Sequence, residues 1–288
     1  MAMSKPNLYR TVAEMQSSSL RWKREGLHIG FVPTMGALHE GHLSLLDLVR
    51  PHCDRLVVSV FVNPTQFGPQ EDFKRYPRNL EEDLRLLEKR RADVVFAPQT
   101  EEMYPKDYAI YVEVERLSSV YEGAIRPGHF RGVCTIVAKL FNIVQPDVVA
   151  FGQKDAQQVA VLRRMTRDLH FPMEFLVGPT IRESDGLAMS SRNAYLTADQ
   201  RIKATVLYRA LKAAETRILA GEKNAERVRE AMRSVFAEVA EFRLDYGDIV
   251  SPESFEQVTE IRGKVLLIIA GRIGSVRLID NLSVSLGP

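Results

Sequence analysis

Two histidines stand on a glycine-containing segment near the start of the chain, Pro33-Thr-Met-Gly-Ala-Leu-His-Glu-Gly-His42. The apolar run His28–Val32 precedes this segment and a helical pattern follows from Leu43, which predicts a strand, a turn and a helix start. The first N–H groups of a helix have no partner inside it and carry partial positive charge, so a helix start is suited to phosphate. His39 and His42 would add imidazole groups there. The residue types therefore predict phosphoryl chemistry at this turn.

The spacing H-x-G-H resembles the signature of nucleotidyl-transfer enzymes built on a dinucleotide-type α/β fold. One alternative is a turn whose histidines only cap the helix and face water. A second alternative is a zinc site. Metalloprotease histidines lie four positions apart on a helix, whereas His39 and His42 lie three apart and the nearby sequence offers no obvious third ligand. We therefore expect phosphate binding and no zinc.

Amide side chains follow a second apolar run. Asn63 and Gln66 come directly after Arg55–Val62. In a doubly wound sheet, ligands bind outside the carboxyl ends of the strands. Neutral amides at this edge could bind a small polar substrate, or the segment could be an Asn-Pro turn without a ligand.

A third apolar run, Asp147–Phe151, is followed by the segment Gly152-Gln-Lys-Asp-Ala-Gln-Gln158. Lys154 carries a compact charge suited to phosphate. Asp155 could accept hydrogen bonds from ribose hydroxyls or cap a helix, and these two roles are compatible. Gln158 would lie one helical turn further along.

A polar loop containing Met189-Ser-Ser-Arg192 lies further along the chain, within Ile181–Asn193. It resembles the mobile phosphate-binding K-M-S-K-S loop of class I aminoacyl-tRNA synthetases. The serine hydroxyls and the planar fork of Arg192 are suited to phosphate oxygens. Paired with an upstream H-x-G-H, this loop predicts a second clamp on phosphate.

Three acidic residues, Glu81, Glu82 and Asp83, lie early in an expected helix. Acidic groups at this position interact favourably with the helix dipole, and one of them could instead hold Mg²⁺ beside a triphosphate. The basic turn Arg126–Arg131 is either a connection or a flap over the substrate.

Strands and helices alternate through the first part of the chain. We expect strands at 28–32, 55–62, 93–97, 147–151 and 173–177, and helices at 8–25, 41–50, 80–90, 132–144 and 155–169. This alternation predicts an α/β fold, a Rossmann-like, doubly wound parallel sheet covered on both faces. The near-continuous apolar character of several runs is typical of buried parallel strands.

The alternation of strands and helices ends after about Glu183. Two amphipathic helices are expected at 198–220 and 225–241, followed by strands at 244–250, 264–269 and 276–281. Helices followed by strands predict a separate, smaller α+β domain. We therefore expect one domain over residues 1–183 and a second over 184–288.

Composition narrows the function classes. The chain has 288 residues and a net charge of +2, which gives no reason to expect nucleic acid or a membrane as partner. Its longest apolar run, Val265–Ala270, is too short to cross a bilayer, and the start of the chain does not resemble a signal peptide. Cys53 and Cys134 are expected to be buried thiols in a reducing cytoplasm.

Taken in order, these segments resemble the pantoate–β-alanine ligase (pantothenate synthetase) family, of the H-x-G-H nucleotidyltransferase and class I aminoacyl-tRNA synthetase-like superfamily. The resemblance spans Pro33–Asn193. It implies a nucleotide- and pantoate-binding Rossmann-like domain with a small C-terminal lid. The implied reaction condenses (R)-pantoate with β-alanine using ATP, through a pantoyl-adenylate, to give pantothenate, AMP and pyrophosphate. It also implies Mg²⁺ with ATP as co-substrate, and a homodimer.

The resemblance also implies roles for individual residues. His42, His39, Lys154 and Arg192 would be catalytic, with His42 as the acid next to the phosphates. Gln66 and Gln158 would bind pantoate, Gln66 would also lie near β-alanine, and Asp83 matches an acidic Mg²⁺ position. Asn63 stays a substrate-binding candidate from its place after the strand. The ATP-binding residues would be Met35, Gly36, Ala37, Leu38, His39, Glu40, Gly41, His42, Gly152, Gln153, Lys154, Asp155, Ile181, Met189, Ser190, Ser191 and Arg192.

Two other functions fit parts of the pattern. A different H-x-G-H transferase would move AMP onto a phosphate or nucleotide, and its product would be a dinucleotide rather than free AMP. A regulatory nucleotide sensor would bind ATP without turnover. A tRNA-linked role is disfavoured by the weak charge and by the lack of an obvious tRNA-binding domain.

Overall fold

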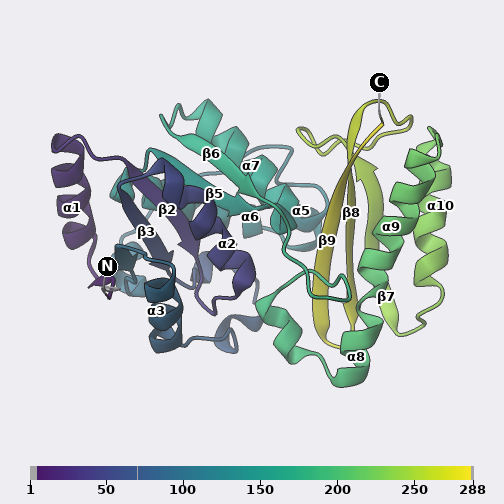
Figure 1. The fold of residues 1–288 in the computed structure, drawn as a ribbon, viewed down its shortest axis with the longest axis horizontal. Helices are drawn as coiled ribbons and strands as arrows, with labels where there is room; N and C mark the ends of the chain where they lie inside the picture. Colours follow the sequence, from purple (N-terminus) through teal and green to yellow (C-terminus); the bar gives the residue numbers. More distant parts are fainter. Residues whose placement is uncertain (1–4, 70, 287–288) are drawn as a thin grey trace. The chain divides into compact units, whose positions relative to one another are not determined.

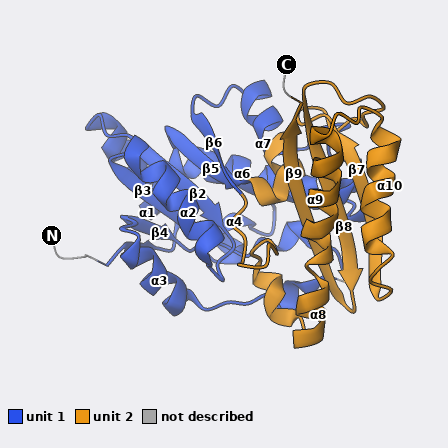
Figure 2. Cartoon of the chain, turned by 45° about the vertical axis from the view of Figure 1, so that its right-hand side comes forward, with its two compact units in different colours: residues 1–152, 161–179 blue, residues 153–160, 180–288 orange. Residues whose placement is uncertain are grey.

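The computed structural model describes residues 5–69 and 71–286. They form two compact units: unit 1 covers residues 1–152 and 161–179, and unit 2 covers residues 153–160 and 180–288 (Figure 2). Unit 2 thus begins a few residues before the expected boundary at 183/184, and it includes a short segment of the first part of the chain. Within the described ranges, no helix has the length and apolar character needed to cross a bilayer.

Unit 1 contains a six-stranded, fully parallel sheet in the order β1-β4-β3-β2-β5-β6. The strands are β1 Asn7–Tyr9, β2 Ile29–Thr34, β3 Arg55–Val60, β4 Val94–Phe96, β5 Val148–Gly152 and β6 Glu174–Gly178. The chain runs outward from β2 in one direction through β3 and β4, then restarts beside β2 with β5. The point between β2 and β5 is therefore the topological switch, where ligands of such sheets bind. The predicted Rossmann-like sheet is confirmed.

Helices cover both faces of this sheet (Figure 1). The helices of this part of the chain are α1 Val12–Arg24, α2 Glu40–Val49, α3 Leu80–Lys89, α4 Thr100–Met103, α5 Glu122–Ile125, α6 His129–Val144 and α7 Ala156–Asp168, which continues from unit 2 into unit 1. Single 3₁₀ turns occupy η1 Arg50–His52, η2 Pro64–Gln66, η3 Asp72–Lys74 and η4 Gln153–Asp155. Helices α2 and α3 bury Leu46 and Leu87 against Val32 and Val58 on one face. Helix α6 contacts α1 and β2, and Phe31 is fully buried.

The expected helix over residues 8–25 was wrong at its start. Residues Asn7–Tyr9 form β1, which pairs with β4, and the helix begins only after Thr11. The Thr11 side chain accepts the N–H of Glu14, and the Glu14 carboxylate accepts the N–H of Thr11, which makes a capping box. A three-residue strand leaves no alternation pattern, so the local sequence could not distinguish it from helix.

Unit 2 contains the antiparallel sheet β7-β8-β9, with α9 and α10 lying along it (Figure 1). Its elements are η5 Ser191–Tyr195, α8 Ala198–Lys203, α9 Val206–Leu219, α10 Ala225–Phe236, β7 Phe242–Val250, β8 Lys264–Ile273 and β9 Val276–Ser285. Leu211 and Met232 share a buried cluster with Leu267 and Ile269, which joins the helices to the sheet. The predicted α+β architecture of the C-terminal part is confirmed.

The expected helix over 198–220 is two helices. The Thr205 N–H and hydroxyl both donate to the carbonyl of Ile202, so the chain tightens between α8 and α9. The expected helix over 225–241 ends at Phe236, because residues 237–241 turn into β7. In both cases a local turn interrupted a continuous amphipathic pattern.

Candidate active site

The H-x-G-H turn lies where β2 reaches the switch point. The Thr34 hydroxyl donates to the carbonyl of Ser59 (2.7 Å) and accepts the N–H of Gly36 (3.2 Å), which ties the end of β2 to β3. Gly36 and Ala37 then take positive φ values of 79° and 51°. This reversal turns the chain directly into helix α2, whose N-cap is His39.

His39 and His42 cap helix α2 with their rings. Nδ1 of His39 accepts the N–H of Gly41 (3.2 Å), and Nδ1 of His42 accepts the N–H of His39 (3.3 Å). The ring centroids lie 4.1 Å apart. Because each Nδ1 acts as an acceptor, the proton of each neutral ring belongs on Nε2. Any hydrogen bond that a neutral ring of this turn donates must therefore come from its Nε2.

Glycine between the histidines has a steric reason. A Cβ on Gly41 would lie 2.9 Å from Cε1 and 3.0 Å from Nδ1 of His39. A larger residue would push the His39 ring out of its cap. The two histidines therefore do cap helix α2, as the alternative interpretation of the sequence expected. The same caps orient both imidazoles at a helix start, where anions are favoured.

Asp83 holds this turn from helix α3. Its carboxylate accepts the N–H of Leu38 (2.9 Å) and of Ala37 (3.2 Å), and its residue is only 2% exposed. Burial raises the pKa of Asp83, and the two N–H donors act against that rise. A Cβ on Gly36 would lie 2.8 Å from Oδ2 of Asp83, so the carboxylate and the turn are closely fitted.

Asp83 fits a resident Mg²⁺ poorly. Both of its oxygens already accept backbone N–H groups, and its neighbour Glu82 pairs with Arg85 (2.6 Å). Across residues 5–69 and 71–286, no cluster of three or more His, Cys, Asp or Glu side chains is arranged to bind a metal. The geometry instead makes Asp83 a support for the H-x-G-H turn.

The Asn63 side chain is buried, and its amide is hydrogen-bonded to other protein groups. It is 1% exposed, and its Nδ2 donates to Oε1 of Gln66 (3.0 Å) and to the carbonyl of Gly132 (3.1 Å). Its Oδ1 accepts the hydroxyls of Tyr104 (2.8 Å) and Thr65 (3.0 Å). These contacts fix which way the Gln66 amide faces, with its Nε2 lying 3.2 Å from the sulfur of Met35.

The basic turn found in the sequence supports Gln66 from its backbone side. Arg126 pairs with both oxygens of Glu71 (2.6 and 2.8 Å), and its Nη1 lies 3.1 Å from Nε2 of His129. Nδ1 of His129 lies 2.8 Å from the carbonyl of Gln66. The geometry is satisfied when Arg126 donates to Nε2 and the Nδ1–H donates to the carbonyl, which requires a neutral ring. Burial, aided by the Arg126 charge, lowers the pKa of His129 to about 4.

In unit 2, the Lys154 turn is held by the last strand. Nδ2 of Asn281 donates to the carbonyls of Gln153 (2.9 Å) and Lys154 (2.8 Å). Asp155 is exposed at the end of η4, directly before α7. Gln158 is half-buried, whereas its neighbour Gln157 is 5% exposed. The sequence contained no local signal for Asn281.

The Ser-Ser-Arg segment follows a tight hairpin-like loop. The N–H of Met189 donates to the carbonyl of Ile181 (2.9 Å), so two expected ATP contacts are neighbours in space. The Ser190 hydroxyl then accepts the N–H of Arg192 (3.3 Å) and caps η5. Arg182 braces the loop by donating to the carbonyl of Gly186 (3.0 Å) and to the carboxylate of Asp280 (2.6 and 2.9 Å).

The expected site residues thus fall into two sets. Unit 1 brings the H-x-G-H turn together with Asn63, Gln66 and Asp83. Unit 2 brings together the Lys154 turn and the segment from Ile181 to Arg192. A cavity of about 240 Å³ in unit 1 adjoins Met35, Gly36 and Asp83 and is also lined by Arg78. Gln66 is not among the described residues that line it.

A parallel α/β sheet with an H-x-G-H helix start at its switch point, in a chain that also carries a Ser-Ser-Arg loop, is typical of the H-x-G-H nucleotidyltransferase superfamily. Comparison of the whole chain with known families is more specific. The profile of the Pantoate-beta-alanine ligase family matches residues 7–283, and the chain belongs to this family.

Known relatives agree over nearly the full length. The chain is 52% identical to a pantothenate synthetase from Thermotoga neapolitana over 274 residues, covering 95% of this chain and 98% of that protein. The crystal structure of pantothenate synthetase from Thermus thermophilus is similar with a TM-score of 0.92 and 49% identity, over 96% of this chain and 98% of the other. A pantoate-beta-alanine ligase from Francisella tularensis, complexed with beta-gamma ATP and beta-alanine, is similar with a TM-score of 0.79 and 32% identity, over 96% and 97% of the two chains.

Proposed function

We propose that this chain condenses (R)-pantoate with β-alanine at the expense of ATP, releasing pantothenate, AMP and pyrophosphate. The observation that carries the proposal is the reciprocal capping of α2 by His39 and His42 at the switch point. Two oriented imidazoles at a helix start would suit the binding of a phosphate group, and the relatives of this chain are ligases of this type.

Activation of pantoate solves a leaving-group problem. A carboxylate is a poor acyl donor because oxide would have to leave. In the first step, a pantoate carboxylate oxygen attacks the α-phosphorus of ATP, an O–P bond forms, and the bond to the bridging oxygen breaks to release pyrophosphate. In the second step, the β-alanine nitrogen attacks the acyl carbon, AMP leaves, and the amine loses a proton.

The first step builds negative charge on phosphate oxygens and on pyrophosphate. Donors that are already oriented stabilise such charge most effectively, because they need not reorganise during the reaction. His39 and His42 would supply Nε2–H donors, with His42 as the acid next to the phosphates. The other donors would be Lys154, Ser190, Ser191 and Arg192.

Gln66 and Gln158 would bind pantoate, and Gln66 would also lie near β-alanine. The fixed Gln66 amide supports this role, because a substrate then meets one defined orientation of donor and acceptor. Asn63 would act on pantoate chiefly through Gln66, since its own amide groups are already hydrogen-bonded.

The acyl-adenylate must be protected from water until the amine arrives. The proposed ATP contacts come from residues of both units. Closure of the Ser190–Arg192 loop and of the C-terminal unit as a lid would exclude water.

Three further features belong to this proposal. Mg²⁺ would arrive with the triphosphate as part of the co-substrate, because both Asp83 oxygens already accept backbone N–H groups. A homodimer is the proposed assembly, by analogy with the family. A cytoplasmic location is proposed from the two free cysteines, of which Cys134 is buried.

Pyrophosphate–ATP exchange tests the first step directly. Radiolabelled pyrophosphate should enter ATP when pantoate is present and β-alanine is absent. Adding β-alanine should produce free AMP and pantothenate. A dinucleotide product would favour an enzyme that transfers AMP permanently onto a phosphate or nucleotide, and ATP binding without pantoate-dependent turnover would favour a nucleotide sensor.

A further inference from the structure

We infer that strand β9 positions the proposed nucleotide-binding segments of unit 2 through two adjacent residues, Asp280 and Asn281. The inference rests on the proposed function, since it concerns how the ATP contacts are held. Both residues are almost fully buried, at 3% and 4% exposure. They lie more than a hundred residues from Lys154, yet β9 contacts both η4 and η5.

Asn281 holds the Lys154 turn with its whole amide. Its Nδ2 donates to the carbonyls of Gln153 (2.9 Å) and Lys154 (2.8 Å), and its Oδ1 accepts Nε2 of Gln153 (3.1 Å). Fixing two successive carbonyls fixes the peptide planes on both sides of the Lys154 Cα. A lysine side chain is long and flexible, so the direction in which it leaves the backbone decides where its charge can reach.

Asp280 holds the second proposed ATP segment, Ile181–Arg192, through Arg182. Its carboxylate pairs with Nη1 (2.6 Å) and Nη2 (2.9 Å) of Arg182 in a bidentate geometry. Arg182 also donates to the carbonyls of Gly186 (3.0 Å) and Asn281 (3.2 Å), and its guanidinium lies 4.3 Å from the ring centroid of Tyr208. The guanidinium is thus immobilised in the loop that leads to Met189.

The two connections form one network. Oδ1 of Asp280 accepts the N–H of Asn281 (2.7 Å), and Nη2 of Arg182 donates to the carbonyl of the same asparagine. A displacement of either proposed ATP segment would therefore strain contacts to the other. Asp280 and Asn281 are positioning residues in this scheme, because they act through Lys154 and the Arg182 loop.

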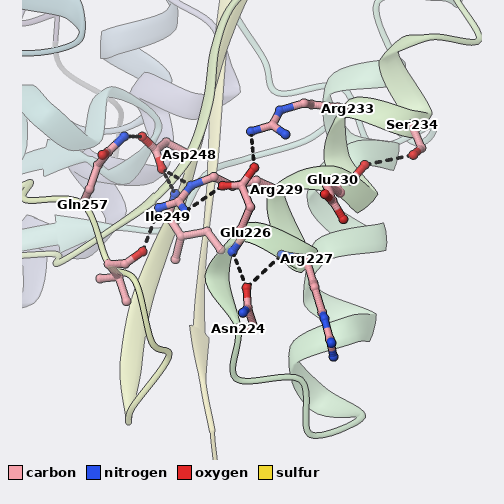
Figure 3. A network of polar contacts seen from close by, with 11 residues as sticks. Asn224, Glu226, Arg227, Arg229, Glu230, Arg233, Ser234, Asp248, Ile249 and Gln257 are labelled. Atoms are coloured by element: carbon pink, nitrogen blue, oxygen red, sulfur yellow. Dashed lines mark hydrogen bonds and ion pairs between the residues drawn. The ribbon is translucent and has the colours of Figure 1, made fainter.

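Unit 2 contains a second ion pair that resembles Asp280–Arg182 but holds no proposed ATP segment, and it can serve as a control. Asp248 pairs with Arg229 (2.6 Å), and its Oδ1 accepts the N–H of the following residue, Ile249 (2.8 Å), as Figure 3 shows. Oδ1 of Asp280 accepts the N–H of Asn281 in the same way. The side-chain exposures are similar, 7% and 11% against 1% and 17% for Asp280 and Arg182. Arg229 joins α10 to β7 and to the carbonyl of Val258, and none of these is a proposed ATP segment.

The test compares Asn281→Ala and Asp280→Asn with the control Asp248→Asn. Pantoate-dependent pyrophosphate–ATP exchange gives KM for ATP and for pantoate, and urea unfolding gives stability. We expect KM for ATP to rise about tenfold in the two β9 variants, because a tenfold change corresponds to the free energy of about one hydrogen bond. KM for pantoate should stay within about twofold of the wild-type value. Asp248→Asn should lose stability while KM for ATP remains unchanged.

Two outcomes overturn the inference: an unchanged KM for ATP in a folded β9 variant, or the same rise in the control. If Asn281→Ala does not fold, the result for Asp280→Asn, which conserves the shape of the side chain, decides whether the inference holds. If the wild-type protein shows no exchange at all, the proposed function fails instead. Calorimetric titration with ATP then compares the same variants, and equal affinity for wild-type and folded β9 variants overturns the positioning role independently.

Discussion

Replacing Asp83 should reveal whether this carboxylate supports the H-x-G-H turn or binds a metal. Alanine removes the acceptor for two backbone N–H groups. The N–H of Leu38 is buried, so the loss of its carboxylate acceptor costs about 2–3 kcal/mol, as for any buried donor that loses a charged partner. Ala37 is half-buried and water can reach it, so its longer bond adds less than about 1 kcal/mol. The expected total is about 2–4 kcal/mol.

Asp83→Asn is the sharper variant because it conserves shape. Its single amide oxygen can accept only one of the two N–H groups at full strength, while its NH₂ group opposes the other. We expect the free energy of unfolding to fall by about 1–3 kcal/mol. Pyrophosphate–ATP exchange should fall as well, since a displaced turn moves both histidine donors.

The assay is urea unfolding together with exchange measured over a series of Mg²⁺ concentrations. If Asp83 supports the turn, exchange should be reduced at every Mg²⁺ concentration and stability should fall. A metal ligand would behave differently: the Mg²⁺ requirement would rise, excess Mg²⁺ would restore the rate, and stability would be unchanged. That second result would refute the reasoning. Glu82→Gln, which removes an exposed carboxylate beside it, should change stability by less than about 1 kcal/mol.

The remaining predictions concern the histidines and glutamines. His42→Ala should reduce exchange about 10²- to 10³-fold, as for a lost transition-state donor, and near-wild-type exchange would contradict its role. Gln66→Ala and Gln158→Ala should each raise KM for pantoate, and unchanged pantoate saturation in both would show that the pocket is elsewhere. The depressed pKa of His129, about 4 against 6.5 in the unfolded chain, means that the unfolded state binds the extra proton between these pH values. Stability should therefore fall by up to about 3 kcal/mol as the pH decreases from 7 to 4, and His129→Gln should flatten this dependence in urea unfolding.

Much of the architecture followed from local pattern. Strands β2 to β6 of the parallel sheet and helices α2 and α3 were predicted to within a few residues, because buried runs and amphipathic periods are local properties. The three-residue strand β1 was missed, since its pairing with β4 is a tertiary contact. The break between α8 and α9 was missed because a continuous amphipathic stripe does not show where a hydroxyl captures a backbone carbonyl.

The sequence alone determined the sheet type, the family and the turn that carries the histidine cap, because His39, Gly41 and His42 satisfy one another within a single helical turn. Only the tertiary structure decided what holds that turn and the Lys154 turn in place. Asp83 reaches Leu38 from 45 positions away, and Asn281 reaches Lys154 from 127. A side chain's hydrogen-bond partner at such distances depends on how the whole chain folds, and no local spacing encodes it.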